Sequence, residues 1–215
     1  MGSVIFDMDG LLIDSERLFV DEWMAAAGRR GIAVRAEQLI PAIGLVGEAC
    51  RQILSDAVGG QAQLLAIRSE VRERYASGLA RPALRPGAHA LLQHLHAKGV
   101  RCAVASSSNL AEIEQRLGEH DLLRFLQAWA GGDEVARSKP EPDVYQLAAH
   151  RLGVAAADCL AFEDSDHGAE AALAAGMRVV LVPDLKTPPA DLLARCHHVS
   201  DTLVGLHDWT LVQLR

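Results

Sequence analysis

Short apolar runs alternate with helical stretches along most of the chain. Each run is bounded by turn or helix signals, which is typical of buried strands in a parallel sheet. The runs lie at residues 4–6, 100–105, 126–130, 159–162 and 179–182. Helical stretches lie between them, at 87–98, 110–117, 143–152 and 166–175, and parallel strands need such crossovers. The pattern predicts an α/β fold built on a doubly wound parallel sheet.

Residues at the ends of these stretches support the same bounds. Ser165 precedes the last helix, where its hydroxyl can cap the first turn. Gly99, Gly153 and Gly176 follow helical stretches, at positions where the chain favours a left-handed residue. We therefore expect helices to end at these glycines.

Residues 16–83 interrupt the alternation. They carry several helical stretches and no strong strand signal. The alternating pattern resumes after Pro82 and Pro86, which suit a hinge. The sequence therefore predicts two domains, a core formed by residues 1–15 and 84–215 and an all-helical insert formed by residues 16–83. The expected helices of the insert include 16–27, 47–58 and 61–79.

Composition excludes several classes of partner. The 215 residues are 50% hydrophobic and 23% charged, which is ordinary for a globular protein that buries a core. The net charge of −7 disfavours nucleic acid or an anionic membrane as a partner, because both need a basic face. No apolar run approaches the length of a membrane span, and no signal segment precedes the first strand. We therefore expect a cytoplasmic protein.

The cysteines give no sign of a metal or redox site. Cys50, Cys102, Cys159 and Cys196 are far apart, and the chain has no Cys-x-x-Cys pair. Free thiols are the expected state.

Two carboxylates stand where the first apolar run ends. Asp7 and Asp9 follow residues 4–6, and Gly10 lets the backbone turn sharply. In open α/β sheets, ligands bind at the carboxyl ends of the strands. One carboxylate can attack as a nucleophile, while the other gives a proton to the leaving group and later takes one from water. This pair indicates phosphoryl transfer.

Polar residues also end two other apolar runs. Ser106 can donate its hydroxyl to a phosphate oxygen, and the backbone N–H of Ser107 adds a donor. Glu163 and Asp164 reach the same edge of the predicted sheet as Asp7, and neighbours on an extended chain point in opposite directions. Taken alone, these residues are equally consistent with turn or helix-start positions.

Four segments together resemble the ordered motifs of the haloacid dehalogenase superfamily of phosphatases and phosphomutases. They are Asp7-Met8-Asp9-Gly10, residues 104–109, residues 138–142, and Glu163-Asp164-Ser165 with Gly168 and Gly176-Met177. The resemblance covers residues 4 to 182 and is closest to the branch of β-phosphoglucomutase and sugar-phosphate phosphatases. It implies a core of Rossmann type with a helical cap inserted after the first motif.

The resemblance also implies roles for single residues. Asp7 would form an aspartyl phosphate, Asp9 would act as general acid and base, and Lys139 would neutralise the nucleophile and the phosphoryl group. Ser106 and Ser107 would bind phosphate. Asn109 is a weaker candidate for phosphate binding, because it is as easily a helix cap.

A cation is implied because a phosphate dianion and two carboxylates repel one another. Mg²⁺ suits a site made only of oxygen ligands beside phosphate. The implied ligands are Asp7, the backbone carbonyl of Asp9, and Asp164. Glu163 would either bind the metal or act from behind the ligands.

The insert has the position of a cap that closes over the site and selects the substrate. We expect five of its residues to face the site: Trp23, Gly44, Leu45, Val46 and Arg51. Mutases of the resembled branch use a cap arginine and a cap histidine, and the matching positions here are Gly47 and Phe19. Hydrolysis is therefore the simpler expectation, although Arg51 could replace part of the missing charge.

These observations predict a Mg²⁺-dependent phosphatase that acts on a small phosphate ester, a sugar or polyol phosphate. A phosphomutase of the phosphoglucomutase type is the alternative enzyme. A noncatalytic phospho-acceptor or binding module is the alternative of another class, but a phospho-acceptor module would carry its aspartate in mid-chain and lack a helical insert.

Overall fold

The computed structural model describes residues 2–45 and 47–214, and the chain divides into two compact units. The core unit comprises Met1–Ile13 and Leu84–Arg215, and the insert comprises Asp14–Ala83. The sequence pattern assigned residues 14 and 15 to the core. The structure groups them with the insert because Asp14 is the N-cap, and Ser15 the first residue, of the insert's first helix.

The core unit contains a parallel sheet of six strands. Their order is β3-β2-β1-β4-β5-β6, so that β1 lies at the centre and the order reverses between β1 and β4. The doubly wound fold is confirmed, and the reversal places a ligand crevice at the carboxyl ends of these two strands. The strands are β1 Ser3–Phe6, β2 Cys102–Ala105, β3 Ala128–Ala130, β4 Cys159–Glu163, β5 Arg178–Leu181 and β6 His198–Val199.

The sheet differs from the prediction in the starts of β2 and β3 and in a sixth strand. Strand β3 begins at Ala128 rather than at residue 126, because the Leu126 N–H donates to the Leu123 carbonyl and closes a 3₁₀ turn. Strand β2 begins at Cys102 rather than at residue 100, because the Val100 N–H donates to the Leu95 carbonyl and closes the preceding helix. Strand β6 was not predicted, since two residues beside polar neighbours form no apolar run.

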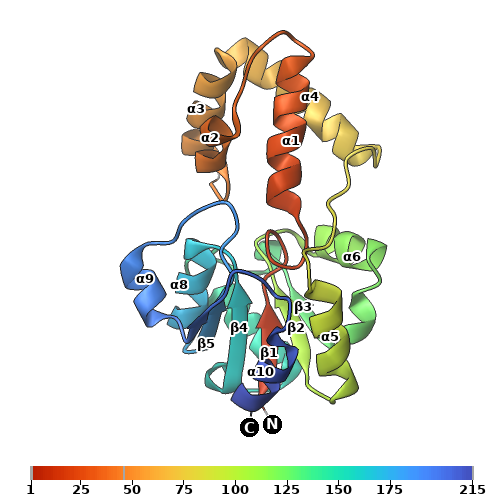
Figure 1. The fold of residues 1–215 in the computed structure, drawn as a ribbon, viewed down its shortest axis with the longest axis vertical. Helices are drawn as coiled ribbons and strands as arrows, with labels where there is room; N and C mark the ends of the chain where they lie inside the picture. Colours follow the sequence, from red (N-terminus) through yellow and green to blue (C-terminus); the bar gives the residue numbers. More distant parts are fainter. Residues whose placement is uncertain (1, 46, 215) are drawn as a thin grey trace. The chain divides into compact units, whose positions relative to one another are not determined.

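Helices cover both faces of the sheet (Figure 1). Phe6 and Phe162 stack at 5.1 Å on one face, in an apolar cluster with α5, α6 and α10. Ile5 and Ala161 point to the other face, against α7 and α8. Successive strand residues thus bury opposite faces, as expected for a sheet covered on both sides. The helices are α5 Ala88–Ala97, α6 Leu110–Glu119, α7 Asp143–Leu152, α8 Asp166–Ala174, α9 Ala190–Arg195 and α10 Leu206–Gln213, with short 3₁₀ turns at Leu123–Phe125, Gly132–Glu134 and Ala156–Asp158.

The predicted helix start at Ser165 and the predicted ends at three glycines are confirmed, whereas α6 runs to Glu119, two residues beyond its predicted end. The Ser165 hydroxyl accepts a hydrogen bond from the Gly168 N–H at the start of α8. Gly99, Gly153 and Gly176 have φ values of 71°, 68° and 82°. These positive φ angles favour glycine, because glycine has no Cβ and so avoids the steric penalty that other residues have there.

The regular structure in the insert's described residues is helical, and turns and short loops join its helices. A partly buried ion pair between Glu22 and Arg74, at 2.5 Å, joins its first and last helices. The last helix ends at Ala76 rather than at residue 79, because Gly78 turns left-handed with φ 71°. The helices are α1 Ser15–Gly28, α2 Ala36–Leu39, α3 Gly47–Val58 and α4 Gln61–Ala76, with a 3₁₀ turn at Ile40–Ala42.

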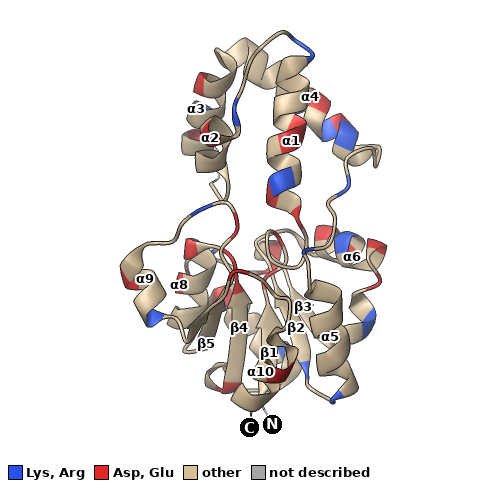
Figure 2. Cartoon of the chain, viewed as in Figure 1, with Lys and Arg blue, Asp and Glu red and all other residues tan. Residues whose placement is uncertain are grey.

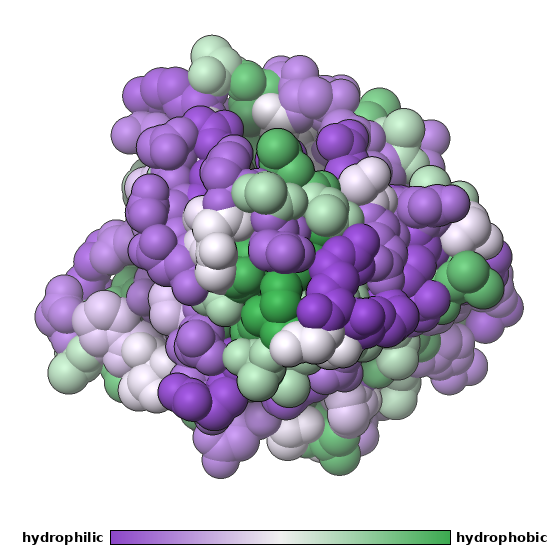
Figure 3. Space-filling view, turned by 90° about the horizontal axis from the view of Figure 1, so that it is seen from above, coloured by the Kyte–Doolittle hydropathy of each residue, from purple (hydrophilic) through white to green (hydrophobic). Residues whose placement is uncertain are grey.

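The helices of the insert bury one face and expose the other. Trp23, Leu54, Leu64 and Ile67 are buried. The face shown in Figure 3 is mostly hydrophilic, with an apolar area near its middle and smaller apolar spots elsewhere. Within residues 2–45 and 47–214, no helix has both the length and the apolar character needed to cross a membrane.

Candidate active site

Acidic residues follow the central strands at the carboxyl edge of the sheet (Figure 2). Asp7 continues β1 for one further ladder bond, because its N–H donates to the Phe162 carbonyl at 2.9 Å. Gly10, with φ 86°, then turns the chain back, and its N–H donates to the Ile13 carbonyl at 2.8 Å. The Asp7 carboxylate is thereby held at the edge with only 6% of the residue exposed.

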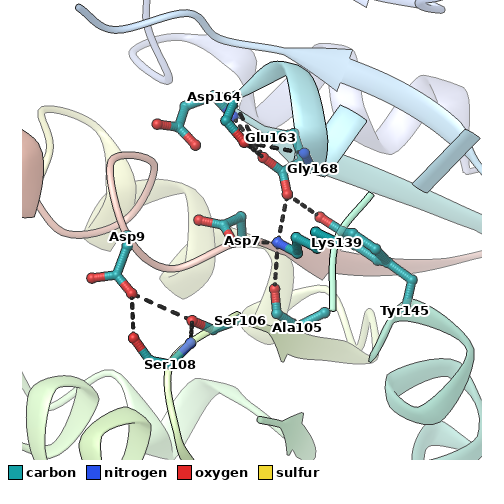
Figure 4. A network of polar contacts seen from close by, with 11 residues as sticks. Asp7, Asp9, Ala105, Ser106, Ser108, Lys139, Tyr145, Glu163, Asp164 and Gly168 are labelled. Carbon is teal, nitrogen blue, oxygen red and sulfur yellow. Dashed lines mark hydrogen bonds and ion pairs between the residues drawn. The ribbon is translucent and has the colours of Figure 1, made fainter. Parts of the chain in front are cut away.

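Lys139 joins three strands through its ammonium group (Figure 4). It lies in the loop between β3 and α7, and Nζ is 2.5 Å from Asp7 Oδ1 and 2.6 Å from Glu163 Oε1. Its third contact is the Ala105 carbonyl at the end of β2, at 3.0 Å. An ammonium has three protons, so these acceptors use its full capacity. The side chain is 6% exposed and therefore fixed in position.

Glu163 is fully hydrogen-bonded inside the same cluster. Oε1 accepts from Lys139 and from the Tyr145 hydroxyl, each at 2.6 Å. Oε2 accepts from the backbone N–H of Asp164 and from both the N–H and hydroxyl of Ser165, at 3.1 to 3.3 Å. With both oxygens occupied, Glu163 orients Lys139 and the start of α8. This arrangement favours a role for Glu163 in positioning neighbouring groups over direct binding of a metal.

Gly168 on α8 leaves room for the Glu163 carboxylate. A Cβ at this position would lie 1.9 Å from Glu163 Oε1, which no side chain can tolerate without moving the carboxylate. The glycine of the fourth motif is therefore explained by this close approach.

Burial and charge set the protonation of the cluster. Burial raises the pKa of Asp7, and the carboxylates of Glu163 and Asp9 add to the rise, whereas Lys139 opposes it. Burial alone would lower the pKa of Lys139, but Asp7 and Glu163 outweigh it and raise that pKa. Burial and the charge of Glu163 also raise the pKa of Tyr145, which keeps its hydroxyl a neutral donor. The ammonium is thus the stable form of Lys139.

The cluster offers oxygen ligands to a cation. Ligand oxygens of Asp7, Glu163 and Asp164 lie within 4.8 Å of one another, and all three residues are buried. Asp7 and Glu163 share the ammonium of Lys139, and Asp164 adds a third carboxylate close to them, so an added cation relieves the repulsion among the three. Because the oxygens of Glu163 already accept five hydrogen bonds, Asp7 and Asp164 are the stronger candidates for ligands. A donor set of oxygens alone fits Mg²⁺.

Asp9 lies in a second, more open cluster (Figure 4). Its Oδ2 accepts from the Ser108 hydroxyl at 2.8 Å and from the Ser106 hydroxyl at 3.3 Å. Its Oδ1 lies 2.5 Å from Nη1 of Arg116 on α6. The Ser108 N–H donates to the Ser106 hydroxyl at 3.0 Å, which holds the two serines together. The Asp9 side chain is 29% exposed.

The other predicted phosphate contacts are placed differently. Ser107 is exposed, and its carbonyl packs so close to Gly132 that a Cβ there would lie 2.4 Å away. The Asn109 side chain accepts a hydrogen bond from the Glu112 N–H at 2.9 Å and caps α6. The structure thus uses Asn109 as the helix cap, one of the two roles that the sequence allowed.

The predicted specificity residues belong to the insert. Trp23 is 3% exposed and packs against Phe19, with ring centroids 5.7 Å apart. Arg51 is exposed and pairs with Glu48 one turn earlier on α3. Gly44 is exposed and Leu45 is half-buried, while Val46 lies outside the described residues. Their role towards the substrate stays a prediction.

Sequence reasoning missed three side chains of these clusters. Ser108 was included only as part of the second motif, and the sequence analysis singled out neither Tyr145 nor Arg116. Each makes its contact across more than 15 residues of sequence, so no local pattern could reveal it.

A doubly wound sheet with paired aspartates after β1, a buried lysine and a helical insert defines an α/β enzyme of phosphoryl transfer. The chain matches the family model of haloacid dehalogenase-like hydrolases over residues 4–182. It belongs to that family.

Relatives and solved structures agree with this assignment. The chain is 32% identical over 211 residues to the "Probable pseudouridine-5'-phosphatase" of Drosophila melanogaster, covering 95% of this chain and 90% of the relative. It is 32% identical over 180 residues to the phosphorylated carbohydrates phosphatase of Thermotoga maritima, covering 82% of each. The crystal structure of a haloacid dehalogenase family hydrolase from Deinococcus radiodurans, with bound phosphate and sodium, superimposes with a TM-score of 0.84 at 25% identity, covering 100% of this chain and 96% of that one. The chain is a phosphoric monoester hydrolase that acts on phosphorylated metabolites.

Proposed function

We propose that the enzyme is a Mg²⁺-dependent phosphatase of sugar or polyol phosphates that works through an aspartyl phosphate on Asp7. The observation that carries the proposal is the contact between Lys139 Nζ and Asp7 Oδ1 inside a buried cluster. The ammonium fixes one carboxylate oxygen and leaves the other to act on phosphorus. Sugar phosphates are supported by the relative from Thermotoga maritima, which is named for phosphorylated carbohydrates.

The first half-reaction transfers the phosphoryl group to the enzyme. An oxygen of Asp7 forms a bond to phosphorus, while the bond between phosphorus and the ester oxygen breaks. Asp9 gives its proton to the departing oxygen. Lys139 holds the nucleophile in line and neutralises charge on the phosphoryl group, and Ser106 donates its hydroxyl to a phosphoryl oxygen.

The second half-reaction returns the enzyme to its starting state. Asp9, now ionised, takes a proton from water, and the water oxygen bonds to phosphorus as the acyl phosphate bond breaks. Inorganic phosphate leaves and the Asp7 carboxylate is restored. Asp7, the backbone carbonyl of Asp9, and Asp164 would hold Mg²⁺, which neutralises the phosphate charge that these carboxylates would otherwise repel.

The remaining parts of the proposal concern the insert, the partner of the enzyme and its cellular location. We assign substrate selection to the insert, with Trp23, Gly44, Leu45, Val46 and Arg51 as its candidates. The partner is a small phosphate ester, and a cytoplasmic location remains a prediction from the sequence.

Phosphate release from a panel of sugar, polyol and nucleoside monophosphates tests the proposal. The assay compares the enzyme with Mg²⁺ and with chelator, and Asp7→Asn with the exposed control Asp191→Asn. We expect release to need Mg²⁺ and to fall by about 10³-fold or more in Asp7→Asn, with the control unaffected. Acid quenching during turnover should trap phosphate on the native chain and none on Asp7→Asn.

Two results would contradict the proposal. Undiminished release in chelator would remove the role of the metal. Conversion of glucose 1-phosphate to glucose 6-phosphate without release of phosphate would establish the mutase alternative.

A further inference from the structure

Arg116 places a cation beside the proposed general acid. It extends from α6, whose apolar residues Ile113 and Leu117 are buried in the core. Nη1 lies 2.5 Å from Asp9 Oδ1, and the arginine side chain is 30% exposed. Since α6 and Asp9 belong to the same compact unit, this contact does not depend on the position of the insert.

The guanidinium has donors to spare. Its planar group carries five N–H bonds, and among the described residues Asp9 is its one hydrogen-bonding partner, through one oxygen. Some other arginines of the core show the paired geometry, whereas Arg85 and Arg124 bond a carboxylate through one nitrogen, as Arg116 does. Arg151 bonds both oxygens of Glu134 at 2.6 and 2.8 Å, and Arg195 bonds both oxygens of Glu170 at the same distances. Arg116 is thus a half-exposed cation that keeps most of its binding capacity.

The location identifies which part of a substrate Arg116 would meet. Asp7 and Lys139 hold the transferred phosphoryl group, whereas Asp9 gives its proton to the ester oxygen that leaves. A cation bonded to Asp9 therefore stands beside the leaving group. Arginine binds carboxylate and phosphate through two parallel N–H bonds, which is the capacity that remains unused here.

We propose that Arg116 binds an anionic group of the leaving part of the substrate. The preferred substrates are then phosphorylated sugar acids or bisphosphates, in which a carboxylate or a second phosphate lies close to the ester oxygen. This inference rests on the proposed function, because it takes Asp9 as the acid that faces the leaving group. According to this inference, a residue of the core, and not only residues of the insert, selects the substrate.

Matched substrate pairs test the inference. Ethyl phosphate and 2-phosphoglycolate differ by one carboxylate, and propyl phosphate and 1,3-propanediol bisphosphate differ by one phosphate. We expect Arg116→Gln to lower the ratio of kcat/KM for the anionic over the neutral member by at least about ten-fold, mainly through KM. Arg116→Lys should retain part of the ratio, because charge remains without the paired donors. The pair with the larger effect identifies carboxylate or phosphate as the ligand.

Arg195→Gln serves as the control, because it removes a half-exposed arginine of the core away from Asp9. Its ratios should match those of the native enzyme. Equal losses for both members of each pair in Arg116→Gln would overturn the inference, since Arg116 would then act only by positioning Asp9. Unchanged kcat/KM ratios in Arg116→Gln would also overturn the inference. The contact between Arg116 and Asp9 would then be an ordinary surface ion pair. Failure of the proposed function gives a different result. The native enzyme would then release no phosphate, either from the four compounds or from the wider panel.

Discussion

The two ends of the site hold their carboxylates in opposite ways. At the phosphoryl end, the side chains of Asp7 and Lys139 are 8% and 6% exposed, and every proton of the ammonium is bonded. At the end that we assign to the leaving group, Asp9 and Arg116 are 29% and 30% exposed and share a single contact. A buried ion pair is costly to break, whereas a half-exposed pair contributes little. The contrast indicates a rigid end for the invariant phosphoryl group and an adaptable end for the variable leaving group.

Removing the buried ammonium should have the largest effect. Lys139→Met leaves Asp7 and Glu163 buried without their cation, so we expect the free energy of unfolding to fall by about 3–5 kcal/mol. We expect kcat/KM to fall by about 10³-fold, because Asp7, the proposed nucleophile, loses its orienting partner. Urea unfolding and phosphate release measure the two effects. The control is Lys98→Ala, which removes a lysine at an exposed helix end. If Lys139→Met kept activity within ten-fold of the native enzyme, Lys139 would have no role in the reaction.

Filling the space beside Glu163 should have the next largest effect. Gly168→Ala puts a Cβ 1.9 Å from Glu163 Oε1, so the carboxylate must leave Lys139 and Tyr145. We expect about a 10²-fold loss of kcat/KM and a lower unfolding midpoint, although alanine favours a helix by about 1 kcal/mol.

Gly118 in α6 provides a matched control for that substitution. Its Cβ would meet only Leu123 Cδ1, at an ordinary 3.6 Å. Gly118→Ala should therefore stabilise the protein by up to about 1 kcal/mol. If both alanine variants were stabilised and active, Glu163 would not be held in the position described.

Removing the Tyr145 hydroxyl should have a moderate effect at the same end. Tyr145→Phe deletes one of the five hydrogen bonds to Glu163 and leaves Lys139 on the same oxygen. We expect a loss of about 1–2 kcal/mol in unfolding free energy and less than about ten-fold in kcat/KM. A double-mutant cycle with Glu163→Gln checks the mechanism, because the two losses should be strongly non-additive. Additive losses would mean that Tyr145 acts elsewhere.

The sequence predicted the rigid end better than the adaptable one. Strand β1 is followed directly by Asp7, and strand β4 ends at Glu163 and is followed by Asp164. The strand pattern alone therefore predicted that these three residues lie at one edge of the sheet. Lys139 needed the motif resemblance, because a loop lysine has no periodicity that indicates burial. Its three acceptors come from the ends of three strands, which only the folded chain brings together.

The adaptable end depends on contacts that no local pattern encodes. Arg116 has the exposure of an ordinary surface helix residue, and its contact with Asp9 spans 107 residues. The roles of Trp23 and Arg51 depend on how the insert meets a substrate, which periodicity within the insert does not specify. Strand β6 was missed for a simpler reason, since its pairing with β5 rather than its composition makes it a strand.

The smallest expected effect separates a helix cap from a site residue. Asn109 and Ser165 both cap helices that start at the edge of the sheet, but only Ser165 also contacts Glu163. Asn109→Ala should cost about 1 kcal/mol of unfolding free energy, as a lost cap does, and Ser165→Ala should cost at least as much. The loss of kcat/KM should be clearly larger in Ser165→Ala, because its hydroxyl also holds the carboxylate that orients Lys139. If Asn109→Ala instead raised KM more than Ser165→Ala did, Asn109 would bind phosphate as well as cap α6, and the open end of the site would extend to it.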